Sequence, residues 1–311
     1  MSMAFTGKAA GFALRPASAH LGADLVDFNL SALLARPSGT AVREFRDALN
    51  QYLVLRASDT ASTHDQLVQF ASLFGDVLSD RKNAEEKDSV QLGRAELKVL
   101  SNAVAPDGRP LGDKGSGPQI WHTDGSFRET PNAYSLLHCV SAPADPPTTS
   151  FMSAYQLYES LPADLKTEIA ELNAIHSVHN RSQDFWDFME GASVSPEKRA
   201  EGALHPLVRL HPETRRPLLY LPRRRDALIQ GRSSLESRLL MERLWAEVFR
   251  SGGFWGVALK AGDFVFFDNR AVLHNREGWP AAQERVVLHL AVAGERPIAA
   301  FPGDRIRRDA A

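Results

Sequence analysis

The chain has 311 residues, of which 43% are hydrophobic and 24% charged, so it can bury a full-sized core. Its 36 basic and 38 acidic residues leave a formal net charge of -2, which gives no overall field for binding nucleic acid or an anionic membrane. A single cysteine, Cys139, excludes an intramolecular disulfide, and no apolar stretch approaches the roughly 20 residues of a membrane span. We therefore expect a cytoplasmic protein that acts on a small molecule.

Two helices are predicted near the N-terminus, where apolar residues recur with helical spacing. The first covers residues 42–52, and the apolar run 53–55 after it is a strand candidate. Thr63 and Gln66 form a capping box for the second helix, and Gly75 is placed to end it. This part of the chain is typical of a helical cover for a sheet.

The middle of the chain alternates loops with helical patterns. Residues 79–120 are polar and rich in glycine, which predicts turns and loops. Residues 155–172 are helical in pattern, with Pro162 at the first position of a helix. The region 176–204 fits an active-site lid and an ordinary surface insertion equally well, because it is polar and contains aromatic residues without a clear period.

Strands dominate the last third of the pattern. The segment 207–221 has two apolar runs around a turn and predicts a hairpin, and Ser233 with Glu236 opens another helix. Residues 264–267 and 286–292 are the most strand-like runs, separated by a stretch rich in turn formers. No βαβ repetition and no Gly-x-Gly-x-x-Gly motif after a strand is present, so we predict one domain, 1–311, that is mainly β with flanking helices, as in a jelly roll.

The motif WHTDGSF, residues 121–127, carries the first chemical signal. If it lies on a strand, His122 and Asp124 point to the same side about 6.6 Å apart at the backbone, and both side chains can reach one ion. Two histidines and a carboxylate suit Fe(II) and leave coordination positions open. His274 is the best third ligand, because we expect it in a loop just after the strand FVFFDN.

Arg285 lies eleven residues after His274 and opens the apolar strand VVLHLAV. Its guanidinium would project into an otherwise apolar cavity, where it can bind a carboxylate of a dicarboxylic acid in bidentate fashion. Taken by itself, the same arginine would be interpreted as a surface charge.

Together these residues resemble the TauD/TfdA family of Fe(II)- and 2-oxoglutarate-dependent dioxygenases, whose fold is the double-stranded β-helix. The resemblance extends from GADLVDFNL through WHTDGSF and HPLVRLHPETRRPLLYL to GDFVFFDNRAVLHNREGW and ERVVLHLAV. It implies that His122, Asp124 and His274 bind Fe(II). It also implies that Arg285 binds the distal carboxylate of 2-oxoglutarate with Thr149, which lies 25 residues after Asp124.

The reaction implied by the resemblance consumes O2 and 2-oxoglutarate, releases succinate and CO2, and hydroxylates or desaturates a small organic substrate. Related halogenases have a small residue at the position of Asp124, so the aspartate favours hydroxylation or desaturation. Relatives are often dimers or tetramers, which makes a homo-oligomer consistent with the resemblance.

The substrate-binding residues are less clearly indicated. His289 stands where many relatives that bind sulfonates or carboxylates have a second arginine, so we expect a weakly anionic or amino-acid-like substrate. Asn102 could contact it, although an asparagine at a strand end is more often a turn residue. The run Arg223–Arg225 is most simply a solvated loop, and attraction of an anion near the cavity is the less favoured interpretation.

Two other functions remain compatible with the residues. A catalytically silent jelly roll could bind a small molecule or a metal, although its intact ligand set counts against this. A hydrolytic zinc enzyme could use the same ligands, but Arg285 and Thr149 would then have no purpose.

Overall fold

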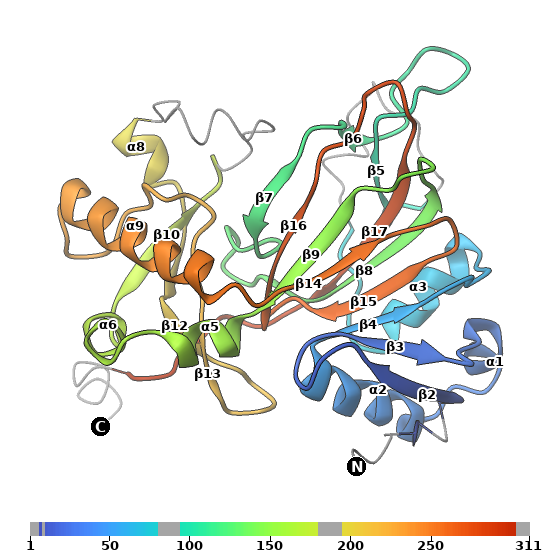
Figure 1. The fold of residues 1–311 in the computed structure, drawn as a ribbon, viewed down its shortest axis with the longest axis horizontal. Helices are drawn as coiled ribbons and strands as arrows, with labels where there is room; N and C mark the ends of the chain where they lie inside the picture. Colours follow the sequence, from blue (N-terminus) through green and yellow to red (C-terminus); the bar gives the residue numbers. More distant parts are fainter. Residues whose placement is uncertain (1–5, 8–9, 80–93, 180–194, 303–311) are drawn as a thin grey trace.

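The structure is a computed structural model that describes residues 6–7, 10–79, 94–179 and 195–302 (Figure 1). Its helices are α1 (Leu30–Ala35), α2 (Gly39–Tyr52), α3 (His64–Ser72), α5 (Ala154–Ser160), α6 (Ala163–Ile169), α8 (Pro196–Arg199) and α9 (Ser234–Ser251). Its strands are β1 (Thr6–Gly7), β2 (Phe12–Pro16), β3 (Ala23–Val26), β4 (Val54–Ala57), β5 (Lys98–Ser101), β6 (Asp113–Lys114), β7 (Gln119–His122), β8 (Asn132–Ser141), β9 (Thr148–Ser153), β10 (Asn173–Ser177), β11 (Gly202–Pro206), β12 (Val208–Leu210), β13 (Pro217–Leu219), β14 (Trp255–Ala258), β15 (Phe264–Asp268), β16 (Val272–Arg276), β17 (Val286–Ala293) and β18 (Ile298–Ala299).

Two sheets form the body of the protein, as the predicted jelly roll requires. The major sheet has the order β1-β2-β3-β4-β15-β8-β17-β5-β6, and the minor sheet has the order β14-β9-β16-β7. Both are antiparallel except for the β3–β4 and β5–β6 pairs. Two smaller sheets, β13-β12-β18 and β10-β11, lie with α9 to one side of this body (Figure 1).

Strand β15 shows how side-chain alternation divides the core. Phe264 and Phe266 face the N-terminal helices, where the Phe264 ring lies 5.1 Å from that of Phe70 in α3. Val265 and Phe267 face the minor sheet. Both faces of the central strand are therefore buried, which explains why its sequence is an uninterrupted apolar run.

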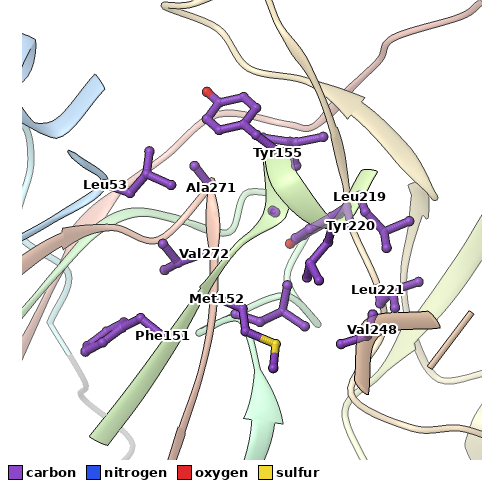
Figure 2. Packing of buried hydrophobic residues seen from close by; sticks show 14 of the residues in the cluster. Leu53, Phe151, Met152, Tyr155, Leu219, Tyr220, Leu221, Val248, Ala271 and Val272 are labelled. Carbon is purple, nitrogen blue, oxygen red and sulfur yellow. The ribbon is translucent and has the colours of Figure 1, made fainter. Parts of the chain in front are cut away.

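A second part of the core joins the minor sheet to the helices of the C-terminal half. Figure 2 shows Met152 of β9 in the same buried cluster as Leu221, which follows β13, and Val248 of α9. This packing holds the segment after the β12–β13 hairpin against the sheets. None of the helices in the described ranges is long and apolar enough to cross a lipid bilayer.

Most elements predicted from local patterns are confirmed. Both capping boxes are present, at Thr63 for α3 and at Ser233 for α9, and residues 208–219 form the expected antiparallel hairpin. Helix α3 ends at Ser72, before Gly75, because its last turn tightens. Pro162 occupies the N-cap position, one residue before α6 begins, and not the first helical position that was predicted.

The expected loop region 79–120 contains three short strands, β5, β6 and β7, in its described part. Of the proposed lid, 176–204, residues 180–194 lie outside the described residues, and the strands that flank them, β10 and β11, pair with each other. A lid at this position therefore stays a prediction.

A buried ion network links the major sheet to the β12–β13 hairpin. Asp268 at the end of β15 accepts a hydrogen bond from Arg270 at 2.6 Å and lies 3.0 Å from His211 Nε2. Arg270 also pairs at 2.9 Å with Glu213, which accepts a hydrogen bond from Tyr134. Burial would raise the pKa of Asp268, but the charges and hydrogen bonds of Arg270 and His211 hold that pKa well below its usual range.

Replacing Asp268→Asn should lower the free energy of unfolding by about 3–5 kcal/mol, because it leaves the buried Arg270 without its main counter-charge. Since the folded-state pKa lies below the unfolded one, this stabilisation is present above about pH 4 and is lost as the pH falls. Urea unfolding followed by circular dichroism measures both effects. In the control Asp164→Asn the lost ion pair with Arg243 is exposed, so stability should hardly change; equal losses would contradict the network's role.

Candidate active site

Two neighbouring strands bring the predicted histidines together. His122 is the last residue of β7, and His274 lies in β16 directly opposite it in the antiparallel register. Their ring centres are 4.3 Å apart. The Asp124 carboxylate completes the group, with Oδ1 3.5 Å from His122 Nε2 and 3.7 Å from His274 Nε2.

The structure corrects how these three residues were expected to converge. Asp124 does not share a strand with His122, because β7 ends at His122 and Asp124 lies in the turn that follows. His274 lies within a strand, not in a loop. The convergence therefore depends on cross-strand pairing between distant segments, and not on alternation along one strand.

Asn269 fixes the turn that carries Asp124, and sequence analysis missed this role. Its side-chain oxygen accepts a hydrogen bond from the Asp124 backbone N–H at 2.9 Å, and its amide nitrogen donates to the Asp124 carbonyl, also at 2.9 Å. The same amide donates to Asn132 in β8 at 3.0 Å, and Asn269 is fully buried. The side-chain amide of Asn269 therefore makes the two backbone hydrogen bonds that a neighbouring strand would make, at the point where β7 has ended.

Hydrogen bonds orient two of the three candidate ligands, His122 and Asp124, whereas His274 Nδ1 has no partner among the described residues. His122 Nδ1 lies 2.7 Å from the Ile120 carbonyl, which makes Nδ1 the protonated nitrogen and leaves the Nε2 lone pair free. Ser135 donates to Asp124 Oδ2 at 3.1 Å, and His289 Nε2 lies 3.2 Å from the same oxygen. Oδ1 is then left to face the two histidines.

The charges of the site favour metal-binding protonation states. Burial lowers the pKa of His274 to about 3, with His122 adding to the effect, so the imidazole is neutral at ordinary pH. Burial would raise the pKa of Asp124, but His274, His122 and His289 hold it well below its usual range. The ligand atoms of His122, Asp124 and His274 all lie within 4.8 Å of one another, so this donor set fits one divalent ion.

The three residues line a cavity of about 600 Å³ that also includes Thr149, Arg285 and His289. Arg285 directly precedes β17, as predicted, and is only 2% exposed to solvent. Among the described residues no carboxylate pairs with it and its Nε has no hydrogen-bond acceptor, while the Trp279 ring lies 5.4 Å from the guanidinium. Burial lowers the pKa of Arg285 from its ordinary value.

Asn102 is not among the residues that line this cavity. Its side-chain oxygen accepts a hydrogen bond from the Arg285 backbone N–H at 3.0 Å. Its amide donates to the carbonyls of Ala281 and Gln283 at 3.1 and 2.9 Å. The expected substrate contact is therefore replaced by a positioning role, in which Asn102 holds the chain that presents Arg285.

Comparison with known proteins agrees with this arrangement. Residues 13–292 match the profile of the family described as taurine catabolism dioxygenase TauD, TfdA family. The chain belongs to the TauD/TfdA family. It is 27% identical over 277 residues to the alpha-ketoglutarate-dependent 2,4-dichlorophenoxyacetate dioxygenase of Burkholderia sp. (strain RASC), a match that covers 85% of this chain and 90% of that protein.

Solved structures of TauD-like proteins share the fold. A putative alpha-ketoglutarate-dependent taurine dioxygenase from Burkholderia xenovorans superposes with a TM-score of 0.72 and 26% identity, over 92% of this chain and 94% of that one. AAD-2, solved in complex with Mn(II) and N-oxalylglycine, gives a TM-score of 0.70 and 26% identity, over 92% and 98%. The protein is accordingly a 2-oxoglutarate-dependent dioxygenase with a jelly-roll fold, and its class uses Fe(II), 2-oxoglutarate and O2.

Replacing Asn269→Ala should weaken Fe(II) binding by about 10–100-fold, because the turn that carries Asp124 loses its three fixing hydrogen bonds. Anaerobic competition of Fe(II) against a chelating indicator measures the affinity, and circular dichroism checks the fold. Asn173→Ala, which removes an amide contact to Gln230 outside the cavity, should bind Fe(II) like the wild type. A folded Asn269→Ala variant with unchanged Fe(II) affinity would contradict the role of Asn269 in fixing the turn that carries Asp124.

Proposed function

We propose that this dioxygenase hydroxylates or desaturates a small organic acid, with Fe(II) bound by His122, Asp124 and His274. We further propose that Arg285 and Thr149 bind the distal carboxylate of 2-oxoglutarate. The observation that carries the proposal is a buried guanidinium, with no acid partner among the described residues, in the same cavity as a two-histidine, one-carboxylate cluster. This combination matches a dicarboxylic co-substrate that binds a metal at one end and an arginine at the other.

The surroundings of Arg285 support an anion site. Thr149 in β9 is 3% exposed and lines the same cavity, so its hydroxyl is available for a carboxylate oxygen. Arg276 of β16 lies opposite Thr149 in register and also lines the cavity. Burial and the nearby charge of Arg285 lower the pKa of Arg276 to about 9. A dianionic ligand would offset these two buried cations.

When bound, Fe(II) supplies the oxidising chemistry, in which one oxygen atom of O2 converts 2-oxoglutarate to succinate and CO2 and the other oxidises the substrate. The chain's own residues hold and orient the reactants. Arg285 fixes the far end of the co-substrate, and Trp279, which covers its guanidinium and is 8% exposed, excludes water there. His122, Asp124 and His274 would hold the ion with three protein ligands, which would leave coordination positions for the co-substrate and O2.

The two rival functions gain nothing from these findings. A catalytically silent protein would have no need to keep all three candidate ligands together with a buried co-substrate arginine. A hydrolytic zinc enzyme would leave the guanidinium of Arg285 buried without an anion, which is costly.

Anaerobic addition of Fe(II) and 2-oxoglutarate to the purified protein should give a visible charge-transfer band. Asp124→Ala should abolish both the band and the succinate release that follows admission of O2, because the cluster loses its only carboxylate. Full Fe(II) retention and activity in this variant would refute the assignment of the ligands. No band in the wild-type protein would favour a silent or hydrolytic protein.

Replacing Arg285→Gln should raise the dissociation constant of 2-oxoglutarate by about 10–100-fold, because a charge-assisted bidentate hydrogen bond is lost. The charge-transfer band gives the constant by titration. A matched control is 2-oxobutyrate, which chelates through the same 2-oxo acid group but has no distal carboxylate. Its affinity should be the same in both proteins, and an equal loss for both ligands would show that Arg285 acts through the fold and not by binding the carboxylate.

A further inference from the structure

Arg223 follows β13 in a run of three arginines whose side chains differ in their surroundings. Arg224 forms two hydrogen bonds to the Asp226 carboxylate, at 2.7 and 2.8 Å. The guanidinium of Arg225 lies 5.2 Å from the centre of the Phe249 ring. Arg223 is the member of the run that lines the cavity of the metal cluster. The expectation of a solvated loop is therefore wrong for Arg223.

The guanidinium of Arg223 has no described partner. No carboxylate of the described residues lies within 4 Å of it, and its Nε has no hydrogen-bond acceptor. Burial lowers its pKa to about 10, against the opposing effect of the Asp124 charge, so it remains a cation at neutral pH. A partly buried cation without a counter-charge is unfavourable unless a ligand supplies one.

Arg223 shares the cavity with the metal cluster and interacts with its charges. The charge of Asp124 acts on the pKa of Arg223, and the charge of Arg223 helps to lower the pKa of His274. The pKa of Arg276, by contrast, is lowered by burial and by the charge of Arg285. A bound Fe(II) would take up the charge of Asp124, which leaves Arg223 without compensation.

His289, the residue that sequence analysis singled out for substrate, faces the metal carboxylate. Its Nε2 lies 3.2 Å from Asp124 Oδ2. Strand β17 itself contains no arginine or lysine, so beyond Arg285, which precedes it, the strand offers no cation for an anionic substrate. Arg223 reaches the cavity from a different segment, the one that follows the β12–β13 hairpin.

We propose that Arg223 binds the anionic head group of the prime substrate, a carboxylate, sulfonate or sulfate ester, beside the metal cluster. Phe127, Leu137 and Val287 line the same cavity and provide apolar surface for the rest of the molecule. A bidentate pair with the guanidinium fixes the head group, and the carbon that is oxidised lies between it and the metal. The inference rests on the proposed function, because it assumes that 2-oxoglutarate occupies Arg285.

The test uses full-length protein loaded anaerobically with Fe(II) and 2-oxoglutarate, whose visible band changes when a substrate displaces water at the metal. Phenoxyacetate, hexanesulfonate and hexyl sulfate are titrated up to about 10 mM, with the neutral phenoxyacetamide as the matched uncharged probe. At least one anion should change the band, and Arg223→Gln should weaken its binding by about 10–100-fold. Comparison of the three anions identifies the head group.

The controls separate a substrate role from a structural one. Arg223→Gln should form the band with an unchanged affinity for 2-oxoglutarate, and Arg223→Lys should retain part of the anion affinity through its charge. Arg225→Gln, two residues further along the chain but with its guanidinium over the Phe249 ring, should behave as the wild type. Equal anion affinity in the Arg223→Gln variant, no response to any of the anions, or a response to phenoxyacetamide alone would overturn the proposal. Absence of the band in the wild type would instead refute the proposed function itself.

Discussion

The pairing of β7 with β16, with Asn269 bridging the turn after β7, is the constraint on which the candidate active site depends. His122 and His274 are far apart in sequence, and they become neighbours because they are register partners. A slip of one residue would turn His274 to the other face of the minor sheet. The hydrogen bond from Thr123 Oγ1 to the Val272 carbonyl, at 3.1 Å, is a further contact that holds this register.

Asn269 explains why the third candidate ligand, Asp124, can lie outside a strand. A carboxylate on a free turn would lose conformational entropy on meeting a metal. Asn269 removes that freedom in advance, because its amide binds both the N–H and the carbonyl of Asp124. The site is thus held by the backbone of a turn and by the paired strands around it, which is the arrangement that preorganises a metal centre.

Strand β17 connects this site to the core by alternation. Leu288 and Leu290 pack against the N-terminal helices, while Val287 and His289 line the cavity on the opposite face. The packing of Leu288 and Leu290 therefore fixes the position of the residues on the cavity face of β17, and of Arg285 just before the strand. Asn102 adds a polar anchor at that end, where the apolar alternation begins.

Local features could be predicted from the sequence because their causes are local. The capping boxes at Thr63 and Ser233 and the β12–β13 hairpin depend on residues a few positions apart. The roles of Asn269 and Asn102 could not be predicted in this way. Each depends on partners more than a hundred positions away in sequence, 145 for Asn269 with Asp124 and 183 for Asn102 with Arg285. The family resemblance predicted the candidate ligands, although not the turn that carries Asp124.

Four arginines that are buried or partly buried can be compared by their partners. Arg270 and Arg209 are paired with carboxylates of the chain, at 2.6 Å to Asp268 and 2.8 Å to Glu295, so their charges are balanced within the fold. Arg285 and Arg223 lack such partners among the described residues, and both line the cavity of the metal cluster. Arg270, Arg209 and Arg285 are all buried and Arg223 is partly buried, so burial by itself does not mark function. The missing counter-charge does, because a folded chain tolerates an unbalanced buried cation only where a ligand's anion can balance it.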